Sequence, residues 1–120
     1  MDEQTILAEL TPVIHSLKTL SLVALDLEDA HPLALPEPPE PAQVAAYERH
    51  MTAIAQQVNP RHQALLKASL QDYRGGFPDR AGKFLQELIT SFLEAPEYAS
   101  AFSPASKQRL KGLMADLQEV

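Results

Sequence analysis

Four histidines are the side chains of this sequence best suited to proton transfer, phosphoryl transfer or metal binding at neutral pH. They stand at positions 15, 31, 50 and 62. Only Glu28-x-x-His31 has the spacing that places two metal ligands on one helix face. Helical di-iron sites use two such pairs and two further glutamates. We therefore predict no metal and no cofactor, and we interpret His31 as the end of a helix that Pro32 stops.

Other common catalytic motifs are missing from the sequence. The chain has no cysteine, which excludes a thiol nucleophile, a disulfide and a thiolate metal site. Its four glycines form no phosphate-binding loop, and neither Gly-x-Ser-x-Gly nor His-Glu-x-x-His occurs. These absences favour a non-catalytic role, although an enzyme or metal protein of a class without short motifs stays open.

The segment His15-Ser16-Leu17-Lys18 lies within an otherwise apolar helical pattern. At about 100° per residue, His15 falls opposite the apolar stripe, so we expect it to be exposed to solvent. Over these four residues the chain resembles the His-x-Leu-Lys core of histidine phosphotransfer domains, which are helical bundles of similar size. The resemblance implies a phosphoacceptor at His15 and a nearby charge on Lys18. The alternative is an ordinary exposed histidine.

An apolar patch is predicted beside His15, because Leu22 and Val23 lie away from the apolar stripe of the same helix. We predict a binding surface of six residues around this patch: His15, Lys18, Thr19, Leu22, Val23 and Asp26. Exposed apolar patches usually have a partner. Another helix of the same bundle, the segment 33–35 folding back, or a second molecule could cover this one.

The charge of the chain is unevenly distributed, with a formal net charge of −6. Residues 1–59 carry nine acidic and two basic residues, and the remainder carries seven acidic and eight basic residues. This balance disfavours nucleic acid and anionic membranes as partners. The longest apolar run, Thr19 to Leu25, is too short to cross a bilayer. We expect a cytoplasmic protein, and the opposed charges of the two halves favour an antiparallel homodimer.

Proline marks the expected helix starts, because its fixed φ and missing N–H suit the first helical position. Five prolines stand at such positions: Pro41, Pro60, Pro78, Pro96 and Pro104. Asn59 and Ser103 precede two of them as expected N-caps, and Gly75-Gly76 is an expected helix end. The spacing predicts helices over about 3–29, 42–58, 60–74, 79–94 and 104–118, with a short turn after Pro96. Pro12 lies inside the first of these, which we expect to be one kinked helix or two abutting ones.

The predicted fold is all-α: a single domain, residues 1–120, forming an antiparallel bundle of about five helices, with a Pro-rich extended connection over 30–41. Phe84, Leu88 and Phe92 should be largely buried in its core. The leucines expected around them are Leu66, Leu70, Leu113 and Leu117. The predicted function is a non-catalytic interaction or regulatory module that binds a protein partner or itself; the alternative is phosphorelay through His15.

Overall fold

The computed structural model describes the backbone of residues 1–30 and 38–120 and the side chains of residues 1–22 and 38–120. Every regular element in these ranges is a helix, which confirms the all-α prediction. The six helices are α1 (Glu3–Ala30), α2 (Pro41–Ala55), α3 (Pro60–Arg74), α4 (Pro78–Glu94), α5 (Pro96–Ala99) and α6 (Pro104–Gln118). The sixth is α5, which forms where a short turn was expected. Of the predicted Pro-rich connection, residues 38–40 are non-helical and 31–37 lie outside the described residues.

Proline begins five of the six helices at the predicted positions. α1 continues through Pro12 as one helix. The hydroxyl of Ser103 accepts the N–H of Ser106 at 3.2 Å, as an N-cap should. After α3, Gly76 adopts φ 84°, the left-handed conformation that glycine tolerates.

Two details at the α2–α3 junction differ from the sequence predictions. α2 ends at Ala55 and not at Val58. Asn59 precedes a proline, which forces it into an extended conformation, so the chain has to leave the helix and turn before it. The side chain of Asn59 does not cap α3; its Nδ2 donates instead to a carboxylate oxygen of Glu97.

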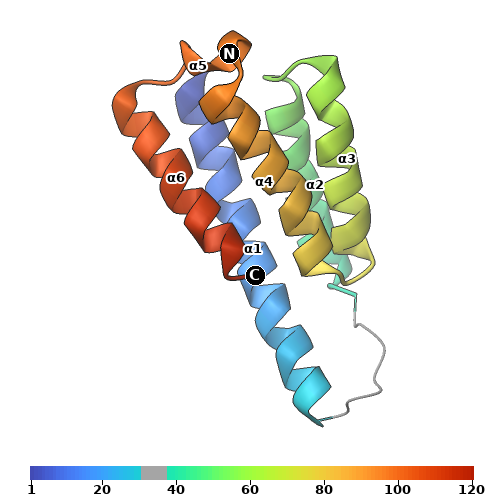
Figure 1. Ribbon diagram of the computed structural model, residues 1–120. Coiled ribbons are helices and arrows are strands. Elements are labelled where there is room, and N and C mark those ends of the chain that lie inside the picture. Colours follow the sequence, from blue (N-terminus) through green and yellow to red (C-terminus); the bar gives the residue numbers. More distant parts are fainter. Residues whose placement is uncertain (31–37) are drawn as a thin grey trace.

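The long helices lie side by side, with consecutive ones running in opposite directions (Figure 1). α1 packs against α2, α4 and α6, while α3 packs against α2 and α4. α1 has 28 residues, whereas the other long helices have 15 to 17. At 1.5 Å per residue, α1 is about 42 Å long, and the other long helices are about 22–26 Å long. The carboxyl end of α1 therefore projects beyond the other helices (Figure 1).

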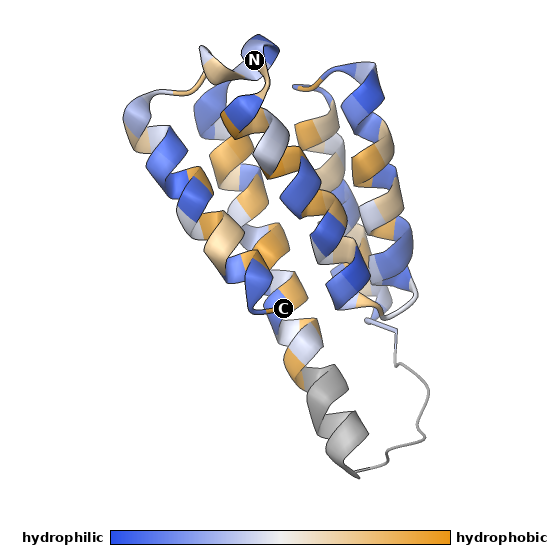
Figure 2. Cartoon of the chain, viewed as in Figure 1, coloured by the Kyte–Doolittle hydropathy of each residue, from blue (hydrophilic) through white to orange (hydrophobic). Residues whose placement is uncertain are grey.

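The core lies between the helices, and apolar and hydrophilic residues alternate around each helix accordingly (Figure 2). Leu88 and Phe92 are buried as predicted. The ring of Phe92 lies 5.2 Å from those of Tyr98 and Phe102. Of the leucines expected nearby, Leu66 and Leu117 are buried, and Leu70 and Leu113 are partly buried against the core. No helix in the described ranges is long and apolar enough to cross a membrane.

Phe84 corrects the core prediction, because it is only half-buried. Its place in α4 is one helical turn before Leu88, but α4 buries mainly a different row: Ala81, Leu85, Leu88, Ile89 and Phe92. α4 is contacted by α1, α3, α5 and α6, and these neighbours leave the edge of the stripe that carries Phe84 incompletely covered.

Candidate functional site

Five exposed residues follow one another along α1 at steps of three or four: Ala8, Thr11, His15, Thr19 and Leu22. Residues at this spacing share one helix face. We call this set the α1 stripe. Three residues of the predicted binding surface belong to it: His15, Thr19 and Leu22. The exposure expected for His15 is confirmed.

Leu22 is the most unusual member of the α1 stripe, because 64% of its surface is exposed. Met1 is the other large hydrophobic residue that is exposed among the described side chains. The larger apolar residues of α1 from residue 6 to residue 20 are all buried: Ile6, Leu7, Leu10, Val13, Ile14, Leu17 and Leu20. Neither another helix nor the rest of α1 covers Leu22 within the described residues.

Lys18 is a predicted surface residue that contacts α6. Its Nζ lies 3.2 Å from Oε2 of Glu119 and 3.5 Å from Oδ1 of Asp116. The hydrogen bond to Glu119 and the charge of Asp116 raise the pKa of Lys18. The ammonium group is thus held by two carboxylates and not by a group beside His15.

The remaining predicted residues, Val23 and Asp26, lie in the helical backbone of α1, and their side chains are outside the described residues. The same holds for Glu28, and His31 lies outside altogether. Elsewhere in the described residues, no group of three or more histidine, aspartate or glutamate side chains is arranged to hold a metal ion.

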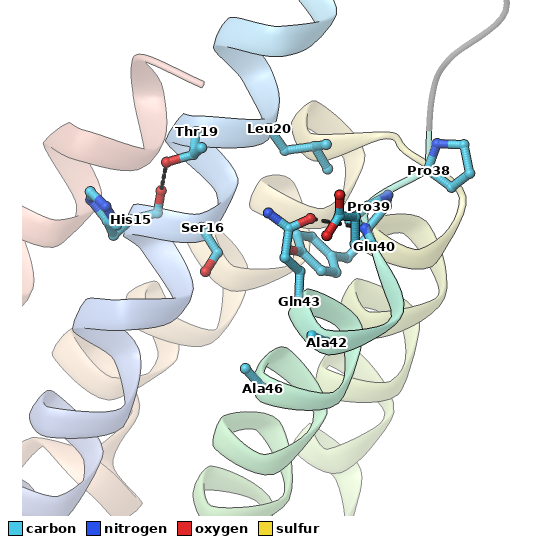
Figure 3. A pocket seen from close by; sticks show the side chains of 11 residues that line it. His15, Ser16, Thr19, Leu20, Pro38, Pro39, Glu40, Ala42, Gln43 and Ala46 are labelled. Carbon is cyan, nitrogen blue, oxygen red and sulfur yellow. Dashed lines mark hydrogen bonds between the residues drawn. The ribbon is translucent and has the colours of Figure 1, made fainter.

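A cavity of about 620 Å³ borders the α1 stripe between α1 and the first turns of α2. Ser16 and Leu20 extend from α1 toward this cavity, and Gln43 faces them from α2 (Figure 3). His15 lies at its margin, on the side of α1 away from Gln43 (Figure 3). The sequence does not predict this cavity, because it forms only where α1, α2 and α3 pack together.

Tyr73 of α3 forms part of the cavity wall, and its ring stacks on Tyr47 with centroids 4.0 Å apart. Burial raises the pKa of Tyr73, and the nearby hydroxyl of Ser16 opposes that shift. The hydroxyl of Ser16 itself donates to the carbonyl oxygen of Pro12 at 3.0 Å. These hydroxyls can bind a polar group, but neither is paired with a general base that would make it a nucleophile.

Two other histidines have partners within the bundle. Nδ1 of His50 lies 2.5 Å from Oε2 of Glu9, which links α2 to α1. Nδ1 of His62 lies 2.7 Å from the hydroxyl oxygen of Tyr98. Burial, together with the charge of Arg61, lowers the pKa of His62. Both pairs join helices, so His15 is the exposed histidine of the described residues.

The geometry therefore presents an exposed helix face with one large apolar side chain, a neighbouring cavity and no assembled catalytic group among the described residues. No protein-family model, curated protein or solved structure matches the chain.

Proposed function

We propose that this chain is a non-catalytic protein-interaction module, and that the α1 stripe is its docking surface. The exposure of Leu22 carries the proposal. Complete burial of a leucine side chain is worth about 1.5–3 kcal/mol, so a protein partner that covers Leu22 gains binding energy that the isolated chain does not. We also propose that it acts in the cytoplasm, since a chain without cysteine needs no oxidising compartment.

The length of α1 supports this role. Its carboxyl end projects beyond the bundle and carries the longest apolar run of the sequence, Thr19 to Leu25. A helix that serves only the core of its own bundle does not need this length. A helix that continues past its neighbours offers a partner an accessible face along which side chains recur at helical spacing.

Substitution of Leu22 by glutamate tests the proposal. Because Leu22 is exposed, Leu22→Glu should leave the free energy of unfolding within about 0.5 kcal/mol of the wild-type value. It should abolish the association of the chain with other chains, measured by light scattering and by co-purification. Gln108→Glu, an exposed position on α6, is the matched control and should associate normally. A Leu22→Glu chain that unfolds, or that associates as the wild type does, contradicts the proposal.

The second candidate function is phosphotransfer through His15, which its exposure favours. Lys18 counts against it, since Glu119 and Asp116 hold the ammonium group that would neutralise a phosphoryl group. Incubation with a small phosphodonor should label wild type but not His15→Gln if this candidate is right. The label should be lost in acid, as expected for phosphohistidine.

A further inference from the structure

α5 lies at the end of the bundle that carries the N-terminus, far from the projecting end of α1 (Figure 1). We propose that protonation of His62 releases α5 from α3 while the rest of the bundle stays folded, so that α5 is an acid-sensitive flap. The contacts of α5, the hydrogen bonds of Tyr98 and the charges around His62 support this. The flap is separate from the α1 stripe and does not depend on the function proposed for it.

The backbone leaves α5 free to move. In the described part of the chain, no hydrogen bond between backbone groups joins residues 96–102 to another helix. Just beyond them, the N–H of Ser103 donates to Oε2 of Glu3 at 2.7 Å, which ties the start of α6 to α1. Residues 96–102 can therefore open without displacing α6.

Side chains make the links between α5 and the start of α3. The hydroxyl oxygen of Tyr98 lies 2.7 Å from Nδ1 of His62 and accepts the N–H of Asn59 at 2.9 Å. The carboxylate of Glu97 binds Asn59 and Arg61. The Arg61 side chain is 66% exposed, and exposed ion pairs contribute little to stability. Tyr98 is buried, so the attachment of α5 depends mainly on its hydroxyl.

A proton on Nδ1 of His62 disrupts this attachment. Because the Tyr98 oxygen already accepts the N–H of Asn59, the Tyr98 hydrogen donates to Nδ1 of the neutral ring. A protonated Nδ1 is itself a donor, so two donors then face the Tyr98 oxygen. The hydroxyl hydrogen is left without an acceptor among the described residues, and an unpaired buried donor is unfavourable. Protonation of His62 therefore weakens the hold on α5.

The surroundings of His62 also disfavour a positive charge. Arg61 precedes it on α3, and the facing carboxylate of α5, Glu97, is already paired with Arg61. Residues 51–59, which form the end of α2 and the connection to α3, carry no charged side chain, and Glu94 at the end of α4 is exposed. Burial, together with the charge of Arg61, accordingly lowers the pKa of His62.

Release of α5 gives His62 access to water, where a histidine binds its proton near pH 6.5. The released state thus binds the proton more readily than the closed state, so acid shifts the equilibrium toward release. The movement also uncovers apolar surface. The rings of Tyr98 and Phe102 each lie 5.2 Å from that of Phe92, which belongs to α4 and is completely buried. Acidification is in this way coupled to exposure of an aromatic surface at the end of the bundle.

Amide hydrogen exchange tests the flap, because it measures opening separately for each helix. From about pH 7.5 to about pH 5.5, the opening constant of the Tyr98 and Ala99 amides should rise several-fold, after correction for the intrinsic effect of pH on exchange. Binding of one proton limits the rise to about tenfold. At both pH values the amide of Leu88 in α4 should stay better protected than those of α5. Equal protection would show that α5 opens only when the whole bundle unfolds, which overturns the proposal.

Two histidine variants identify the titrating group. His62→Gln keeps an oxygen that can accept from Tyr98 but does not titrate, so the protection of α5 should no longer change with pH. His50→Gln is the matched control, because His50 contacts Glu9 of α1 and not α5. It should keep the wild-type response. A His62→Gln chain that responds as the wild type does, or a His50→Gln chain that does not respond, overturns the proposal.

The dye anilinonaphthalene sulfonate gives an independent measurement of the uncovered surface, because it binds exposed apolar groups. Its fluorescence should rise in the wild type as the pH falls below about 6.5, while the far-UV circular dichroism stays that of a folded helical bundle. It should not rise in His62→Gln. An equal rise in both chains, or no rise in either, overturns the proposal.

Discussion

The phenolic oxygen of Tyr98 lies 2.7 Å from Nδ1 of His62, and it also accepts the backbone N–H of Asn59 at 2.9 Å. Because that oxygen is already an acceptor, its hydrogen is free to donate to Nδ1 of a neutral His62. These two hydrogen bonds of Tyr98 hold α5 against the first turn of α3. A helix of four residues is not stable by itself, so α5 depends on this anchor.

Tyr98→Phe removes the oxygen and leaves the buried Nδ1 of His62 and the N–H of Asn59 without this partner. We expect the free energy of unfolding to fall by about 1–3 kcal/mol, the usual cost of a buried polar group left unpaired. Urea denaturation measures the loss. Tyr73→Phe is the matched control. Tyr73 borders the cavity, where water can replace a lost contact, so Tyr73→Phe should lower the free energy of unfolding by less than Tyr98→Phe does. Equal losses would contradict this account.

The pH dependence of stability should report the lowered pKa of His62. In the unfolded chain a histidine binds its proton near pH 6.5, whereas the folded chain resists protonation of His62 until a lower pH. The stabilising contribution is therefore complete above about pH 6.5 and is lost as the pH falls toward the lowered folded value. Between about pH 7.5 and pH 5.5 the urea midpoint should fall more steeply for wild type than for His62→Gln. If the urea midpoints of the two chains fall equally with pH, His62 is not the source of the pH dependence.

The two phenylalanines of α4 should differ in their contribution to stability. Phe92 is completely buried against Tyr98 and Phe102, so Phe92→Ala should cost about 3–5 kcal/mol. Phe84 is half-buried, so Phe84→Ala leaves a smaller void and should cost clearly less. Thermal and urea unfolding of the two variants compare them directly. A Phe92→Ala chain with the wild-type melting temperature would contradict the packing of α4.

Ser69 is a buried polar residue whose hydroxyl has two partners. It lies 2.7 Å from the hydroxyl oxygen of Tyr47 and donates to the carbonyl oxygen of Ala81 at 2.9 Å. Ser69→Ala leaves the hydroxyl of Tyr47 without an acceptor. Because burial raises the pKa of Tyr47 strongly, this hydroxyl keeps its proton and remains a donor that needs an acceptor. We expect Ser69→Ala to cost about 1–3 kcal/mol. In the background of Tyr47→Phe the same substitution should cost less, which a double-mutant cycle detects. Additive losses would show that the two hydroxyls are not coupled.

Sequence alone determined where most helices begin, because the chemistry involved is local. Proline lacks an N–H, but the N–H of the first helical residue has no partner within the helix, so proline costs nothing there. This preference depends on the local sequence and needs no distant neighbour. The positions of Pro41, Pro60, Pro78, Pro96 and Pro104 were therefore sufficient. The exposure of His15 could also be predicted, since the side of α1 opposite its apolar stripe follows from helical periodicity alone.

Only the tertiary structure decided which partner each polar side chain has. Lys18 pairs with Glu119 of α6 and not with a group on its own helix, and Asn59 reaches Glu97 in place of its expected cap. Helical spacing indicates the face on which a residue lies, but it does not indicate which helix packs against that face. The burial of Ser69 and the cavity beside Ser16 depend in the same way on how neighbouring helices pack against one another, which is decided only when the bundle forms.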